Sequence, residues 1–123
     1  MFKNNFSYEI ITLENPGLIT QGFRNIMLKR FQGRLDSLIM CHGSFCPGKL
    51  EESQIDVFDY TLNVNVRSSF HLLSLASPFL KLTKGNVVLV SSIYAKKLYK
   101  DSFLECLSSV INFNFTYNIK YRL

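Results

Sequence analysis

Long apolar runs are absent from this chain of 123 residues, and none reaches the roughly 18 residues that would span a bilayer. The N-terminal segment MFKNNFSYE also lacks the apolar core of a secretory signal. Cysteine is scarce, and the odd count of 3 argues against a disulfide framework and fits a reducing compartment. These absences favour a cytoplasmic protein with no membrane partner.

Metal-binding and nucleic-acid-binding patterns are also missing. Cys41, His42 and Cys46 match no zinc spacing, and no second Cys or His pair completes a site, so no metal is expected. The formal net charge is +5, but the sequence has no run of Arg and Lys. The C-terminal FNFTYNIKYRL combines aromatic residues with only Lys120 and Arg122, a positive footprint too small to predict a nucleic-acid partner.

Short apolar runs that alternate with helical patterns predict the order of elements. The runs typical of strands are Tyr8–Leu13, Ser37–Cys41 and Asn86–Ser91. A helix is expected over residues 17–31, where Gly33 would end it. A last helix is expected to start at Asp101 and Ser102. The late stretch INFNFTYNI has poor helix propensity and is compatible with either a helix or a strand.

A long helix is expected between the second and third strands. Ser53 is a suitable N-cap, and apolar or small side chains follow at steps of three or four residues. This predicted buried face comprises Ile55, Phe58, Leu62, Val66, Ser69, Leu73, Ala76 and Leu80. Pro78 lies within the pattern and is expected to kink or end the helix. Lys84-Gly85 closes the segment.

The alternation of strands and helices predicts the fold class. Strands that are apolar throughout indicate an α/β protein with a parallel sheet and helices on both faces. Strands 37–41 and 86–91 should be neighbours or near neighbours that run in the same direction. Ligands bind such sheets at the carboxyl ends of the strands. Gly43 and the pair Ser91–Ser92 are therefore expected at one edge of the sheet, where a ligand would bind.

Three segments in this order resemble motifs of the short-chain dehydrogenase/reductase family. LDSLIMCHG (35–43) is similar to its LDxLVNNAG strand and turn, NVNVRSSF (63–70) to its Asn-containing helix, and KGNVVLVSS (84–92) to its GxIVxVSS strand. The resemblance covers residues 8–109 and leaves 110–123 as a divergent tail of a single domain, 1–123. It implies a partial Rossmann-like fold, a doubly wound parallel sheet of about three strands with flanking helices.

The resemblance also implies roles for individual residues. Gly43, preceded by Cys41 and His42, resembles the turn where the family's backbone approaches NAD or NADP. Asn65 resembles the helix Asn that holds a water of the proton relay. Ser92 resembles the catalytic Ser that hydrogen-bonds the substrate carbonyl or alcohol. Simpler interpretations stay open: Gly43 as a turn, Asn65 as a polar residue beside the core, and Ser92 as a cap.

The family's proton donor is missing from its expected place. That donor is a Tyr, and a Lys four residues later lowers its pKa and holds the cofactor ribose. An ungapped overlay after Ser92 places Glu105 at the Tyr position and Ser109 at the Lys position, and the chain contains no YxxxK. An ionised Glu cannot donate a proton to a carbonyl. The sequence therefore predicts the remains of an active site, reduced to Ser92 and Asn65.

The glycine-rich turn that receives the cofactor pyrophosphate is missing as well. The 6 glycines, at positions 17, 22, 33, 43, 48 and 85, do not fit the family's TGxxxGxG spacing. The resemblance also starts near the family's third strand. Little affinity of this chain for NAD or NADP is therefore expected.

Three hypotheses about function follow. Family chemistry would be NAD(P)-dependent oxidation of an alcohol or reduction of a carbonyl, but the losses above predict an inactive chain. The alternative is a non-catalytic fragment or pseudoenzyme that pairs with itself or with a full-length relative. In the family, such pairing uses the helices that correspond here to residues 54–82 and 102–119. The third hypothesis is an incomplete gene product without a selected role.

Overall fold

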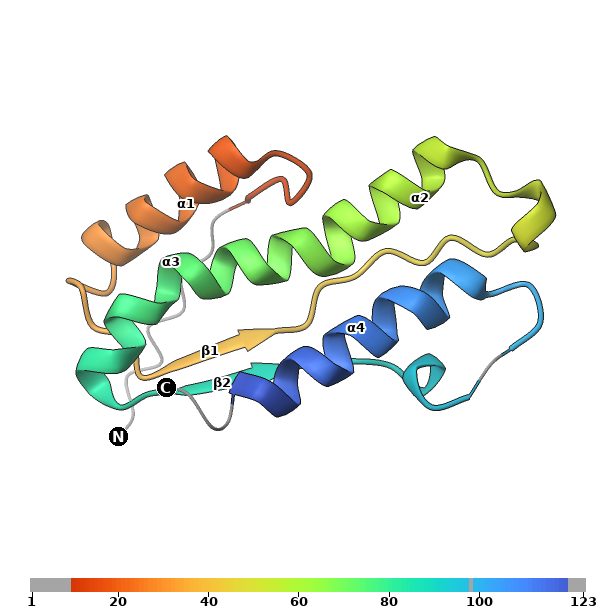
Figure 1. Cartoon of the computed structure of the whole chain (residues 1–123). Coiled ribbons are helices and arrows are strands. Elements are labelled where there is room, and N and C mark those ends of the chain that lie inside the picture. Colours follow the sequence, from red (N-terminus) through yellow and green to blue (C-terminus); the bar gives the residue numbers. More distant parts are fainter. Residues whose placement is uncertain (1–9, 98, 120–123) are drawn as a thin grey trace, which may run out of the picture.

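A computed structural model describes residues 10–97 and 99–119 of the chain, with helices packed beside two strands (Figure 1). The elements are α1 (Pro16–Lys29), β1 (Ser37–Met40), the 3-10 helix η1 (Leu50–Glu52), α2 (Ile55–Leu62), the π-helical η2 (Asn63–Arg67), α3 (Ser68–Thr83), β2 (Asn86–Leu89), the 3-10 helix η3 (Ile93–Ala95) and α4 (Phe103–Ile119). α2, η2 and α3 are continuous and form the long helix of residues 55–83. None of the described helices is long and apolar enough to cross a membrane.

The two strands pair in parallel, with residues 37–40 of β1 in register with residues 86–89 of β2. This confirms the predicted α/β fold and the predicted pairing of these neighbouring strands. Side chains of a strand alternate between its two faces. Met40 and Leu89 are buried, whereas Ile39 on the opposite face of β1 is 64% exposed.

The predicted first strand is wrong over the residues that the structure describes. Ile10–Leu13 takes part in no sheet, while Tyr8 and Glu9 lie outside the described residues. The sheet of the described chain thus has two strands, and the expected third strand is absent from it. Ile11 packs on α1 instead, where a Cβ added to Gly22 would stand 2.7 Å from the Ile11 side chain. Alternating apolar residues in a short segment occur both in strands and in extended segments that pack on a helix, and the pattern does not distinguish the two.

α1 occupies almost the predicted residues, and both of its ends are capped. The Asn15 side chain accepts hydrogen bonds from the backbone N–H groups of Gly17 (2.9 Å) and Leu18 (3.3 Å). At the other end Gly33 adopts a left-handed φ of 79°, and its N–H donates to the carbonyl of Met27 at 3.0 Å. Gly33 therefore ends the helix as predicted, because glycine enters this conformation without steric cost.

The long helix starts and continues differently from the prediction. Gln54, not Ser53, precedes its first turn, and the Ser53 hydroxyl donates to the carbonyl of Lys49 at 2.8 Å. Pro78 does not end the helix, which continues to Thr83. A proline removes the hydrogen bond to the carbonyl four residues earlier, here that of Ser74. Both Ser74 and Pro78 are exposed, so water can hydrogen-bond that carbonyl.

The π-helical segment η2 changes which side of the long helix is buried. A π turn contains an extra residue, so the faces before and after it no longer follow one helical pattern. Ser69, Ala76 and Leu80 of the predicted face are buried, but Ile55 is 69% exposed. The buried residues of the first half are instead Thr61, Val64, Asn65 and Ser68, mostly polar, and a search for apolar periodicity misses them.

α4 extends to Ile119, so the stretch 111–119 is a helix and its interpretation as a strand is wrong. Tertiary contacts override weak propensity here. Asn112 is buried and its side-chain amide donates to the backbone carbonyl of Asn65 at 2.9 Å. Asn114 donates to the carbonyl of Val110 within its own helix.

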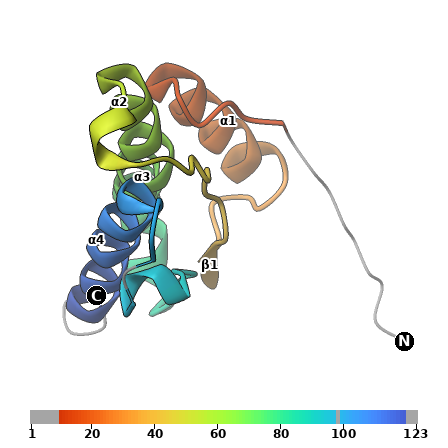
Figure 2. The same cartoon turned by 90° about the vertical axis from the view of Figure 1, so that its right-hand side faces the viewer.

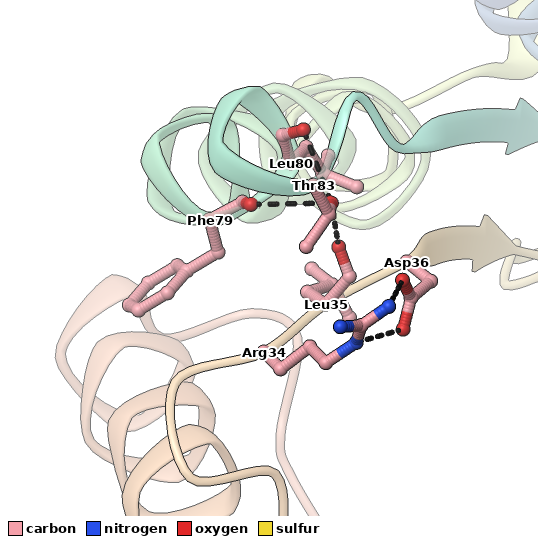
Figure 3. A network of polar contacts seen from close by, with 6 residues as sticks. All are labelled: Arg34, Leu35, Asp36, Phe79, Leu80 and Thr83. Carbon is pink, nitrogen blue, oxygen red and sulfur yellow. Dashed lines mark hydrogen bonds and ion pairs between the residues drawn. The ribbon is translucent and has the colours of Figure 1, made fainter.

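The core lies between α1, the long helix and the sheet. Its buried members are Phe23, Met27, Ala76 and Leu80. The long helix passes between α1 and α4 (Figure 2). The end of α3 is tied to the start of β1, because the Thr83 hydroxyl donates to the carbonyl of Leu35 at 2.6 Å (Figure 3).

Candidate functional site

A pocket of about 230 Å³ lies at the carboxyl ends of β1 and β2. All of the residues that the sequence compares with the family's catalytic and cofactor-binding positions line it. They are Cys41, His42 and Gly43 after β1, Ser92 after β2, Asn65 from η2, and Glu105 and Ser109 from α4. The predicted convergence of Gly43 and Ser92 at one edge of the sheet is therefore confirmed, and it follows from the parallel pairing of the strands. Their catalytic and cofactor-binding roles stay predictions.

Asn65 connects three elements around the pocket. Its Oδ1 accepts hydrogen bonds from the Ser44 backbone N–H at 2.6 Å and the Ser44 hydroxyl at 3.2 Å. Its Nδ2 donates to the Ser44 carbonyl at 3.1 Å and to the Ser108 hydroxyl at 3.0 Å. Both lone pairs of Oδ1 and both N–H groups of Nδ2 are thus used in hydrogen bonds. Asn65 holds the loop after β1 and the helix α4 against the long helix.

His42 is held by two serines of the long helix. Its Nε2 lies 2.7 Å from the Ser68 hydroxyl and 3.1 Å from the Ser69 hydroxyl. These hydroxyls donate their single protons to the carbonyls of Val64 and Asn65. With the hydroxyl protons on those carbonyls, the tautomer that carries its proton on Nε2 satisfies both serine oxygens. Burial lowers the pKa of His42, so the imidazole is neutral at neutral pH.

Glu105 and Ser109 contact each other, as their spacing of one helical turn permits. The Ser109 hydroxyl donates to Oε1 of Glu105 at 3.4 Å. Oε2 is shielded from solvent and has no hydrogen-bond partner among the described residues. Burial raises the pKa of Glu105, and the hydrogen bond from Ser109 opposes this in part. That these two residues occupy the positions of the family's Tyr and Lys stays a prediction of the sequence overlay.

The two serines after β2 have different tasks. The Ser91 hydroxyl donates to the backbone carbonyl of Ser109 at 3.0 Å and ties the strand end to α4. Ser92 caps η3, since its side chain accepts from the N–H of Tyr94 at 3.3 Å. This supports the simpler interpretation of Ser92 as a cap. Its hydroxyl proton is not used in that bond.

Five residues of the site were missed from the sequence: Ser44, Phe45, Val90, Ser108 and Asn112. Ser108 and Asn112 had a signal, because they follow Glu105 by three and seven residues and so share one face of α4. Ser44 had none, because its position beside Asn65 depends on a contact between residues 21 apart in sequence. The described residues contain no group of three His, Cys, Asp or Glu side chains suited to a metal ion.

A family profile described as short chain dehydrogenase matches residues 15–103. The chain belongs to the short-chain dehydrogenase family. A hydroxysteroid 11-beta-dehydrogenase 1-like protein of Xenopus tropicalis is 33% identical over 64 residues, 52% of this chain and 22% of that protein. The match thus covers less than a quarter of that protein's length.

Solved short-chain dehydrogenases share the fold. One from Saccharomyces cerevisiae has a TM-score of 0.88 at 22% identity, and the match covers 98% of this chain and 47% of that chain. A 7 alpha-hydroxysteroid dehydrogenase complexed with NADH and 7-oxo glycochenodeoxycholic acid has a TM-score of 0.82 at 18% identity, covering 90% and 43%. This short-chain dehydrogenase chain therefore spans about half the length of these structures.

The described residues do not fit the phosphates of a nicotinamide cofactor. A pyrophosphate needs free N–H groups at a glycine-bearing helix N-terminus. Gly17 lies at such a terminus, in α1, but its N–H and that of Leu18 are both taken by the Asn15 side chain. No catalytic step through that cofactor is therefore derived for these residues.

The raised pKa of Glu105 should make the stability of the chain fall as pH rises. The folded state holds the carboxyl proton of Glu105 more tightly than the unfolded state does. The stabilisation that results is fully present below the unfolded pKa of about 4.3 and is lost as pH rises through the folded pKa. Urea unfolding between pH 4 and about 8 should show that Glu105→Gln gains stability relative to the wild type as pH increases. Exposed Glu51→Gln is the control and should follow the wild type. A difference in the free energy of unfolding between Glu105→Gln and the wild type that does not change with pH would contradict the raised pKa of Glu105.

Proposed function

We propose that this chain is a non-catalytic member of the short-chain dehydrogenase family that acts by pairing with a second chain. The observation that carries the loss of catalysis is the contact between Glu105 and Ser109 at the positions of the family's Tyr and Lys. The described lining of the pocket contains no Lys or Arg that could replace the missing cation. A proton donor of this kind contributes about 10²–10⁴ to the rate.

An apolar hollow between the long helix and α4 supports the pairing. It has a volume of about 360 Å³, and its walls include Leu62, Val66, Phe70 and Ile111. Phe70 is 60% exposed. Arg67 is the one charged residue in its described lining. Exposed apolar surface around a hollow is typical of protein interfaces, and a two-fold axis would bring this surface against the same surface of a second copy.

We expect no nicotinamide-dependent turnover by this chain. The phosphates lack a binding turn in the described residues, so restoring only the motif in Glu105→Tyr/Ser109→Lys should not create activity either. NADH and NADPH fluorescence titrations of both proteins, followed by turnover assays with small ketones and aldehydes, would test this. Saturable micromolar binding of NADH or NADPH by the wild type, or turnover by the double variant, would overturn the proposed loss of catalysis.

Pairing is tested by sedimentation as a function of protein concentration. The wild type should shift from monomer to dimer, and Phe70→Glu should remain monomeric because it places a charge in the apolar hollow. Leu28→Glu is the matched control, since Leu28 is 74% exposed but lies on α1, and it should still dimerise. A wild type that stays monomeric throughout would contradict self-pairing. Binding to a full-length relative in that case would favour the heterodimer.

We place this pairing in the cytoplasm. Cys41, Cys46 and Cys106 are all free thiols in the structure. Unpaired cysteines suit a reducing compartment, where thiols are kept reduced.

A further inference from the structure

The pocket between the strand ends and α4 contains a carboxyl group whose bonding is incomplete. Oε1 of Glu105 receives one long hydrogen bond from Ser109, and Oε2 receives none from the described residues. A shielded carboxylate oxygen without a donor destabilises the folded chain, because it has lost water and gained nothing in exchange. A ligand with strong N–H donors would supply the missing bonds.

The charge of the pocket wall favours a cation. Besides Glu105, its titratable side chains are those of Cys41 and His42. His42 is neutral at neutral pH, since burial lowers its pKa and its Nε2 proton is already directed at Ser68 and Ser69. With no Lys or Arg in the described lining, an ionised Glu105 makes the wall net negative.

An aromatic group stands at the same pocket. Phe45 lines it, and the Phe45 ring centroid lies 6.0 Å from that of Tyr94. Tyr94 in turn contacts Tyr99 edge to face, with centroids 4.9 Å apart. The faces of such rings attract organic cations and also cover their apolar parts. A carboxylate together with an aromatic side chain is a combination that recognises ammonium groups.

We propose that this pocket binds a small primary ammonium compound, with the ammonium group on the Glu105 carboxylate and its carbon chain beside Phe45. Oε1 accepts only one long hydrogen bond, from Ser109, so it keeps a lone pair for the ammonium group. The cavity of about 230 Å³ suits a ligand of a few heavy atoms. The site is separate from the pairing hollow, because the two share Asn112 alone among their described lining residues.

The test is a titration of the whole ¹⁵N-labelled chain with 2-aminoethanol at pH about 7.5, where the probe is still an ammonium and where Glu105 is more ionised than at acidic pH. Ethylene glycol and glycolate are the neutral and anionic probes of similar size. We expect saturable shifts of the Ser92, Glu105 and Ser109 amide signals with 2-aminoethanol, and none with the other two. Glu105→Gln should weaken binding about tenfold or more, because it replaces a charge-assisted hydrogen bond by a neutral one.

The control variant Glu51→Gln removes an exposed carboxylate away from this pocket and should bind 2-aminoethanol like the wild type. The amide spectrum of each variant shows whether it is folded before the titration is read. Equal shifts with ethylene glycol would overturn the proposal, because the pocket would then not recognise charge. Undiminished binding by Glu105→Gln, or no saturable shift with 2-aminoethanol, would overturn it as well.

Discussion

Replacing Leu80 with alanine should lower the free energy of unfolding by about 2–5 kcal/mol. Leu80 is 1% exposed and packs in the buried core with Phe23, Met27 and Ala76. It also lies where α3 turns toward β2, and a Cβ added to Gly85 would stand 2.8 Å from its Cδ2 atom. Removal of the side chain would leave a cavity between α1 and α3. The surrounding side chains are too closely packed to move into it.

The matched control for this change is Leu82→Ala. Leu82 lies in the same turn of α3 but is 83% exposed, so its replacement should change the stability by no more than about 0.5 kcal/mol. Urea unfolding followed by far-ultraviolet circular dichroism measures both variants. Equal effects of the two substitutions would show that the buried face of α3 has been assigned incorrectly.

Replacing Asn65 with alanine should destabilise the chain by about 2–4 kcal/mol. Its side chain satisfies the backbone N–H and carbonyl of Ser44 as well as the buried hydroxyl of Ser108. An alanine would leave these polar groups without their partner inside the protein. The Ser44 amide signal should also shift strongly, because its 2.6 Å hydrogen bond would be lost.

Asn86→Ala is the control for the loss of an asparagine side chain, because Asn86 is exposed at the start of β2. It should change the free energy of unfolding by at most about 0.5 kcal/mol. A cost for Asn65→Ala within that same range would contradict the structural role of Asn65. The simple interpretation of Asn65 as a polar residue beside the core would then be sufficient.

The positions of the site were predictable from the sequence, but their bonding was not. Local patterns place Gly43 and Ser92 after parallel strands, and parallel strands end at the same edge of a sheet. The bonds that define the site join residues far apart in the chain. Asn65 and Ser108 are separated by 43 residues, and His42 and Ser68 by 26. No local pattern encodes such pairs.

The fold shows the same division. The two paired strands and α1 follow from apolar runs and from the caps Asn15 and Gly33, which act over a few residues. The failures involve longer-range packing. Ile11, before α1, packs on that helix, and residues 10–13 join no sheet. Residues 111–119 remain helical because α4 packs along the long helix.

The sequence alone determined the parallel pairing of β1 and β2 and the placement of Gly43 and Ser92 at one edge of the sheet. These properties depend on residue type and spacing, which the chain carries locally. Only the tertiary structure decided how Glu105 behaves, because the burial that raises its pKa and leaves Oε2 unpaired comes from several elements that meet at the pocket. The surroundings of His42 were decided in the same way, because its Nε2 meets the hydroxyls of Ser68 and Ser69 only when the loop after β1 packs on the long helix.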